Sequence, residues 1–232
     1  MRRATFILPL AAMSELAADV ISHRQTAHSR RVNRKALPDH ALASCSSNSG
    51  KAIMTETASI DLRQFVRDIP DFPKPGILFK DITPLLANPN AFRASIDQLA
   101  NHYQEEAIDV VVAAEARGFV FAAPLALALN VSFVPIRKPG KLPFDRHSFE
   151  YDLEYGSDTL EIHVDGVEPG QRVLVVDDLL ATGGTVDACC RLLEKCGANI
   201  MGCAFVIELL GLGGRAKIGD YDIYSLIQYG DA

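Results

Sequence analysis

Short, continuous apolar runs recur along the chain from about residue 60 and predict buried strands. They cover residues 110–114, 131–136, 173–176 and 201–207, and many of their members are β-branched. Runs of this kind are typical of strands covered on both faces, as in a parallel sheet.

Helical patterns separate some of these runs. Residues 90–105 follow an Asn-Pro-Asn cap region and place Phe92, Ile96, Leu99 and Tyr103 on one face, and residues 119–129 and 186–196 read as further helices. Alternating strands and helices predict an α/β domain with a parallel sheet, whose ligands bind beyond the carboxyl ends of the strands.

The composition fits one packed domain and excludes several other classes. The chain has 232 residues, 48% hydrophobic and 22% charged. The longest apolar stretch, residues 119–133, contains Pro124 and Asn130 and is shorter than the roughly 18 residues of a membrane span, so no membrane partner is expected. Five cysteines without Cys-x-x-Cys spacing indicate a reducing compartment, taken as the cytoplasm, and no structural zinc.

The first 53 residues differ from the rest. They are rich in Arg, Ser, Ala and His and show no sustained period. A signal peptide is disfavoured because Pro9 interrupts the short apolar run, whereas an organelle transit peptide stays open. The favoured interpretation is a non-native or dispensable extension, with the true start at Met54 and one domain over residues 54–232.

Charge is divided unevenly between these parts. Residues 1–53 hold eight Lys/Arg and three Asp/Glu, a net +5, which leaves fifteen and twenty-six, a net −11, for residues 54–232. An acidic body argues against general nucleic-acid binding, which depends on basic side chains. Any phosphate bound by this domain must be held by backbone N–H groups and a few placed cations.

One glycine-rich turn carries the strongest chemical signal. The run Val-Leu-Val-Val ends at Asp177 and Asp178 and turns through Ala181-Thr-Gly-Gly-Thr185 into a helix. Glycines allow close backbone approach, the threonines add hydroxyl donors, and a helix N-terminus favours an anion. The acids would repel that phosphate, so they should face ribose hydroxyls or a hydrated cation. This combination predicts a ribose 5-phosphate site at Asp177, Asp178, Ala181, Thr182, Gly183, Gly184 and Thr185.

Other phosphate motifs fit less well. A P-loop requires Ser or Thr after Gly-Lys, but Leu142 follows Gly140-Lys141. The run Gly211-Leu-Gly-Gly214 follows a strand but breaks the spacing of a dinucleotide-binding motif. Nucleoside triphosphates and NAD are therefore disfavoured.

The stretch 173–185 closely resembles the signature for phosphoribosyl pyrophosphate (PRPP) in type I phosphoribosyltransferases. Within that family, residues 71–83, 115–119 and 153–156 resemble the members that act on adenine. The resemblance covers about residues 58–230. It implies the family's parallel-sheet fold with flanking helices, a flexible lid loop and a small base-binding hood.

Basic residues are expected at the pyrophosphate. Arg117 follows a predicted strand, so it lies at a carboxyl end, and the resemblance gives it the leaving pyrophosphate. Taken without the resemblance, a surface ion pair with Glu115 is the alternative. Arg137, Lys138 and Lys141 begin an aperiodic segment that runs to Gly156, which the resemblance identifies as the lid.

The resemblance also places the base and the proton chemistry. Glu154 is implied as the carboxylate that acts on the purine ring as the lid closes, with Tyr155 beside it. Phe79 is expected to form an apolar wall of the adenine site, and backbone groups near Leu78 to read the base. The resemblance also gives Lys80, which stands where many relatives have Arg, and Tyr155 contacts with adenine.

The implied reaction is transfer of the phosphoribosyl group of PRPP to adenine, giving AMP and pyrophosphate in purine salvage. Mg²⁺ is expected as cofactor, held through PRPP and water with no direct protein ligand, and a homodimer is implied. Two alternatives stay open: a phosphoribosyltransferase for another purine or a pyrimidine, and a non-catalytic regulator of the same fold that senses PRPP or a purine.

Overall fold

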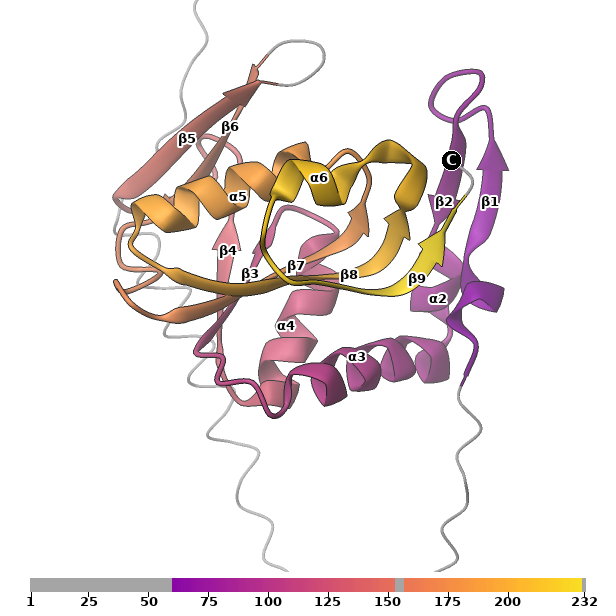
Figure 1. Ribbon diagram of the computed structural model, residues 1–232, viewed down its shortest axis with the longest axis horizontal. Helices are drawn as coiled ribbons and strands as arrows, with labels where there is room; N and C mark the ends of the chain where they lie inside the picture. The colour runs from indigo at the N-terminus through magenta and orange to yellow at the C-terminus, as the bar shows by residue number, and fades with distance from the viewer. Residues whose placement is uncertain (1–59, 153–156, 231–232) are drawn as a thin grey trace, which may run out of the picture. The chain divides into compact units, whose positions relative to one another are not determined.

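Five parallel strands form the central sheet of this protein, seen in a computed structural model that describes residues 60–152 and 157–230. The strand order is β4-β3-β7-β8-β9 (Figure 1). The strands are β3 (Val110–Ala114), β4 (Ser132–Ile136), β7 (Arg172–Leu180), β8 (Asn199–Leu209) and β9 (Ile223–Tyr229). The predicted parallel sheet is confirmed, since every neighbouring pair runs parallel.

Helices cover both faces of the sheet. In Figure 1, α3 and α4 lie below it, and α5 and α6 lie above it. The helical elements are η1 (Leu62–Phe65), α2 (Thr83–Ala87), α3 (Pro89–Tyr103), α4 (Gly118–Leu129), α5 (Gly184–Lys195), η2 (Leu210–Leu212) and α6 (Gly214–Ile218). The three longer helices match the predicted segments, and the Asn88 side chain caps α3 by accepting from the N–H groups of Asn90 and Ala91.

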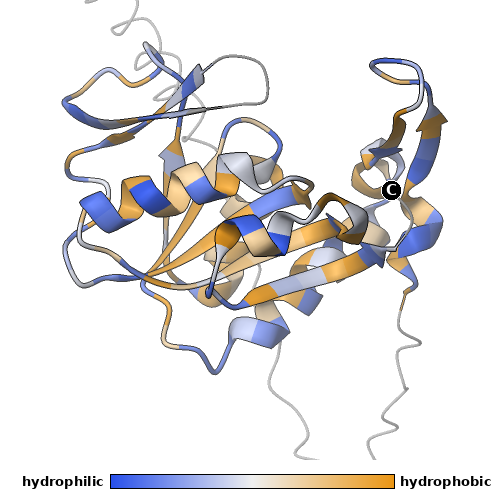
Figure 2. Ribbon diagram, turned by 45° about the horizontal axis from the view of Figure 1, so that its top comes forward, coloured by the Kyte–Doolittle hydropathy of each residue, from blue (hydrophilic) through white to orange (hydrophobic). Residues whose placement is uncertain are grey.

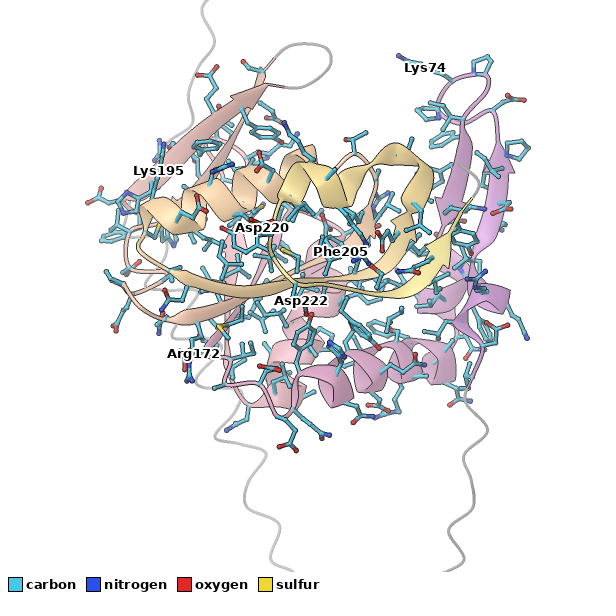
Figure 3. All side chains as sticks on the ribbon, viewed as in Figure 1. Lys74, Arg172, Lys195, Phe205, Asp220 and Asp222 are labelled. Atoms are coloured by element: carbon cyan, nitrogen blue, oxygen red, sulfur yellow. The ribbon has the colours of Figure 1, made fainter. Side chains whose placement is uncertain are left out.

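The core alternates along each strand, which explains why the strand sequences are continuously apolar. Val111 and Leu174 face α3 and α4, whereas Val110, Val173 and Phe205 face α5. Figure 2 shows the sheet largely in hydrophobic colours beneath the mixed surface of α5. In Figure 3, Phe205 lies in the interior while Lys195 points outward from α5. A strand buried on both faces needs apolar residues at every position.

Two antiparallel hairpins flank the sheet and were not predicted as strands. One joins β1 (Arg67–Pro70) to β2 (Leu78–Asp81), and we call it the hood hairpin. The other joins β5 (Arg146–Asp152) to β6 (Ser157–His163). The described part of the expected lid, residues 137–152, therefore has more structure than predicted, because β5 pairs with β6 although its sequence has no apolar run.

Strand β7 also runs further than predicted. The expected strand stopped at the two aspartates, but pairing to β8 continues to Leu180, which lies opposite Glu208. The aspartates thus sit within a paired strand, which fixes their backbone.

The region N-terminal to residue 60 lies outside the described residues, and so does the proposed division at Met54. None of the helices in the described part of the chain combines the length and apolar character needed to cross a membrane.

Candidate ribose-phosphate and pyrophosphate site

The site lies where the strand order reverses. After β3 the chain goes to β4 on one side, and β7 pairs with β3 on the other, so a crevice opens between the carboxyl ends of β3 and β7. A cleft of about 190 Å³ occupies this position. Its lining combines one cation, two acids and the glycine-rich turn: Arg117, Asp177, Asp178, Leu179, Ala181, Thr182, Gly183, Gly184, Thr185 and Val186.

The glycine-rich turn, residues 181–185, forms one wall of the cleft and is called the phosphate loop below. Gly183 adopts a left-handed conformation with φ of 80°, and α5 begins at the next residue. No side chain caps the start of α5. The first N–H groups of this 12-residue helix therefore face the cleft without a side-chain acceptor, as an anion site requires.

The two aspartates form a tightly spaced acidic pair at the floor of the cleft. Asp177 Oδ1 accepts from the N–H of Asp178 at 2.8 Å. Burial, followed by the charge of Asp178, raises the pKa of Asp177. Burial also raises the pKa of Asp178, although Arg117 opposes that effect. The pair is thus strained in its fully charged form, and hydrogen-bond donors or a cation would relieve it.

Arg117 joins the acidic pair to the hood hairpin. Its Nε lies 2.8 Å from Asp178 Oδ2, and its guanidinium lies 5.8 Å from the centre of the Phe79 ring. The alternative pairing of Arg117 with Glu115 is wrong, because Glu115 binds Arg137 instead. Arg117 is half exposed, so it has room to change partners.

The other predicted pyrophosphate cations also lie near acids. Arg137 Nε lies 2.7 Å from Glu115, and Lys138 Nζ lies 2.9 Å from Asp158. Burial works against a charged Glu115, but hydrogen bonds from Arg137 and from the Lys138 N–H outweigh it and lower the pKa of Glu115. Lys141 is exposed and near enough to contribute to that lowering.

Asp158 extends this network to the phosphate loop. It lies directly opposite Tyr151 in the β5–β6 hairpin. Burial raises the pKa of Tyr151, and the Thr185 side chain lies near enough to the Tyr151 hydroxyl to oppose that rise. Lys138, Asp158, Tyr151 and Thr185 therefore connect the predicted pyrophosphate cations to the predicted phosphate loop.

The hood hairpin carries the predicted base-binding residues. Phe79 packs edge-on against Phe72, with ring centres 5.2 Å apart, and Leu78 is 45% exposed. Lys80 points elsewhere: its Nζ lies 2.7 Å from Asp68 and 4.1 Å from the centre of the Tyr229 ring. Of the predicted base-binding residues that the structure describes, Phe79 is the one next to the cleft, because its ring lies near Arg117.

Comparison with known proteins identifies this arrangement. Residues 81–228 match the model of the phosphoribosyl transferase domain. The chain belongs to the phosphoribosyltransferase family. The match contains the acidic pair, the phosphate loop and the four predicted pyrophosphate cations, Arg117, Arg137, Lys138 and Lys141.

Several adenine phosphoribosyltransferases are similar over nearly the whole family domain. The protein of Rhodopirellula baltica is 67% identical over 171 residues, which are 74% of this chain and 83% of that protein. The crystal structure from Thermoanaerobacter pseudethanolicus is 54% identical with a TM-score of 0.71, covering 72% of this chain and 98% of that one. The Saccharomyces cerevisiae enzyme, solved with an iminoaltritol bisphosphate and adenine, is 42% identical with a TM-score of 0.67, covering 71% and 96%.

Two predicted residues, Glu154 and Tyr155, lie outside the described residues. Among the residues that are described, no three His, Cys, Asp or Glu side chains gather into a group able to hold a metal ion.

Asp158 and Tyr151 are neighbours of the predicted site that were missed. They approach the phosphate loop only through hairpin pairing, which their polar sequence did not reveal. Phe72 begins the segment from Phe72 to Thr83 that was expected to form the hood, and its contact with Phe79 depends on the β1–β2 pairing.

Proposed function

We propose that this protein transfers the 5-phosphoribosyl group of PRPP to adenine, giving AMP and pyrophosphate. The observation that carries the proposal is the cleft itself. It brings the phosphate loop, the acidic pair and Arg117 together at the strand-order reversal. A PRPP molecule presents a 5-phosphate, a diol and a pyrophosphate in that order, and the three groups of the cleft match them.

In the proposed mechanism, PRPP replaces the present partners of the acidic pair and of the cations. The ribose diol donates hydrogen bonds to Asp177 and Asp178, which compensates the burial that raises their pKa values. Asp178 then releases Arg117, whose guanidinium turns to the pyrophosphate oxygens. Arg137, Lys138 and Lys141 approach the same group as their contacts with Glu115 and Asp158 loosen.

In the transition state the bond from ribose C1 to pyrophosphate breaks as adenine N9 approaches C1. Negative charge grows on the pyrophosphate, where Arg117 and the other cations stabilise it. Asp177 and Asp178 would face a hydrated Mg²⁺ held through PRPP and water, and that ion would supply further charge neutralisation. Exclusion of water from the cleft protects PRPP from hydrolysis.

The hood hairpin provides the adenine site in this proposal. Phe79 supplies the apolar wall, and it lies beside Arg117, so the base site and the pyrophosphate site are neighbours. The backbone at Leu78 reads the edge of the base. Lys80 acts by joining the two strands of the hairpin through Asp68 and by holding the hairpin to Tyr229.

An assay with separate bases tests the function directly. Full-length protein is incubated with PRPP, Mg²⁺ and one of adenine, hypoxanthine, guanine or uracil, and nucleoside monophosphate and pyrophosphate are measured. We expect AMP and pyrophosphate in equal amounts with adenine. A product with another base alone assigns a different acceptor, and PRPP binding without any product favours a regulator.

We assign Glu154 to proton chemistry at the base. The change Glu154→Gln keeps size but removes the charge that favours N9 as the nucleophile, so kcat should fall by about 10²-fold or more. The KM for PRPP should change little, because the phosphate loop and acidic pair are intact. Steady-state kinetics at saturating adenine measures both. An unchanged kcat would remove Glu154 from the mechanism.

We further propose a homodimer formed through the exposed face of α4. The helix contains no charged residue, and Leu127 is 82% exposed and Val120 38% exposed on its outer side. A helix that is apolar all round is normally covered. A second copy offers the same face, as a two-fold interface requires.

The change Leu127→Glu should convert the dimer to a monomer, because it places a charge in an apolar interface. Sedimentation velocity measures the mass, with Met201→Glu as control, since Met201 is an exposed apolar residue on β8. A monomeric wild type, or a Leu127→Glu variant that stays dimeric, contradicts the α4 interface.

We place the protein in the cytoplasm. The supporting observation is that Cys189, Cys190, Cys196 and Cys203 are all free thiols. Free cysteines are typical of proteins in a reducing compartment. Cell fractionation with an antibody to the native protein tests this placement, which recovery in an organelle fraction contradicts.

A further inference from the structure

The run Gly211-Leu-Gly-Gly214 has a structural place that the proposed reaction leaves unexplained. It follows β8, forms η2 and begins α6, and Gly214 is the buried member of the run. In Figure 1, α6 lies on the same side of the sheet as α5, whose N-terminus forms the phosphate loop. The run therefore lies behind the loop, outside the cleft lining.

Gly214 is in direct backbone contact with the phosphate loop. A Cβ atom added there would lie 2.4 Å from the Ala181 carbonyl oxygen and 2.7 Å from Leu180 Cδ1. A Cβ on Gly183 would lie 2.7 Å from the Gly214 carbonyl oxygen. The two segments thus touch through glycines on both sides, at separations that no other residue permits.

Arg215 fixes this segment to the sheet. Its Nε and Nη2 lie 2.6 and 2.8 Å from the two carboxylate oxygens of Glu208, which is 2% exposed. Its Nη1 also donates to the Ile223 carbonyl at 3.2 Å, and Gln228 donates to Glu208. Arg215 thereby ties α6 to both β8 and β9. A bidentate pair with a buried carboxylate is geometrically specific.

We propose that Gly214 and Arg215 are positioning residues for the 5-phosphate of PRPP. Arg215 holds α6 against the sheet, and Gly214 presses its bare backbone against Ala181 and Gly183, which sets the shape of the phosphate loop. The inference rests on the proposed function, since it gives that loop a ribose phosphate to bind. Anion recognition by backbone amides depends on their convergence, and small displacements of positioned groups are costly.

The variant Gly214→Ala tests the contact. Gly214 has no left-handed backbone, so alanine acts only through its Cβ, which must displace Ala181. We expect the affinity for ribose 5-phosphate to fall by at least about 10-fold and the KM for PRPP to rise similarly. The affinity for pyrophosphate and the KM for adenine should stay within about 2-fold, because Arg117 and the hood hairpin are untouched. A general loss of structure would instead weaken the binding of all four ligands.

The variant Arg215→Lys tests the anchor. Lysine keeps the charge beside Glu208 but cannot make the bidentate contact or reach Ile223 at the same time. We expect a fall of about 3-fold to 10-fold in ribose 5-phosphate affinity, again with pyrophosphate affinity preserved. Gly230→Ala is the control for a glycine change, because a Cβ at Gly230 meets nothing within 4 Å.

The outcomes separate this inference from the function on which it rests. If wild-type protein binds no ribose 5-phosphate, the proposed function fails. If wild-type protein binds it and both variants match the wild type, the positioning role is overturned. If Gly214→Ala does not fold, as judged by circular dichroism, Arg215→Lys decides alone: wild-type affinity in that folded variant overturns the proposal.

Discussion

Replacing Arg117 by lysine should lower kcat/KM for the transfer reaction by about 10²-fold to 10³-fold, the usual cost of one group that stabilises transition-state charge. Lysine keeps the positive charge near Asp178 but offers no planar pair of donors to the pyrophosphate oxygens. Pyrophosphate affinity should fall with it. The affinity for ribose 5-phosphate should change by less than about 3-fold, because that ligand lacks the group that Arg117 binds.

A matched control for this variant is Arg172→Lys. Arg172 also makes a short ion pair, with Asp109 at 2.7 Å, but it lies at the start of β7, away from the cleft (Figure 3). Steady-state kinetics and calorimetry on both variants separate the two sites. Equal kcat/KM for Arg117→Lys and Arg172→Lys would remove Arg117 from the pyrophosphate site.

The change Asp177→Asn should weaken ribose 5-phosphate binding by about 10-fold to 100-fold, the range for a hydrogen bond to a charged group. The same change should stabilise the free protein at high pH. Asn keeps an oxygen to accept from the Asp178 N–H, yet it has no charge to bury beside Asp178. Replacing a buried charge in this way is often worth about 1 kcal/mol or more.

The pH dependence of that gain follows from the direction of the pKa shift. The folded state raises the pKa of Asp177, so it holds the proton more tightly than the unfolded state does. Wild-type stability from this group is present below the ordinary carboxyl pKa and is lost as pH rises through the raised pKa. Thermal unfolding from about pH 5 to about pH 9 should therefore show a stability advantage of Asp177→Asn that grows with pH. An advantage that is constant or shrinks contradicts the assigned strain.

Ribose 5-phosphate binding by the wild type should respond to pH in the opposite sense. The diol donates to charged carboxylates, so binding requires the acidic pair to lose its proton, and affinity should increase with pH through the raised pKa. The strain of the free site and its affinity for the sugar thus have the same origin. Two neighbouring acids are held out of water, and the diol of the ligand supplies the hydrogen-bond donors that they lack.

The parts of the fold that could be predicted are the segments in which apolar residues repeat because the segment is packed against the core. Strands β3, β7 and β8 are largely buried on both faces, so their apolar runs were visible in the sequence. Strand β4 is a mostly half-buried edge strand, and its apolar run was still continuous enough to be predicted. Strand β9, the other edge strand, was missed because Ser225 and Gln228 interrupt its apolar residues. The hairpins were missed because their strands are short or polar.

The part of the candidate site that could be predicted is formed by residues that lie close together in the sequence. The phosphate loop and the acidic pair occupy nine consecutive positions, residues 177–185, and the structure brings them into one cleft with Arg117. The present partners of the cations were not predictable. Arg117 with Asp178, and Lys138 with Asp158, pair across separate elements, and no local pattern encodes such contacts. The role of Gly214 was hidden for the same reason, since its neighbour Ala181 is 33 positions away.

The decisive measurement is titration calorimetry of full-length wild-type protein with ribose 5-phosphate, with and without Mg²⁺. We expect saturable binding of one sugar phosphate per chain that weakens as pH falls and is reduced in Asp177→Asn. Folded protein that gives no binding heat with ribose 5-phosphate, PRPP or AMP at any pH tested would contradict it.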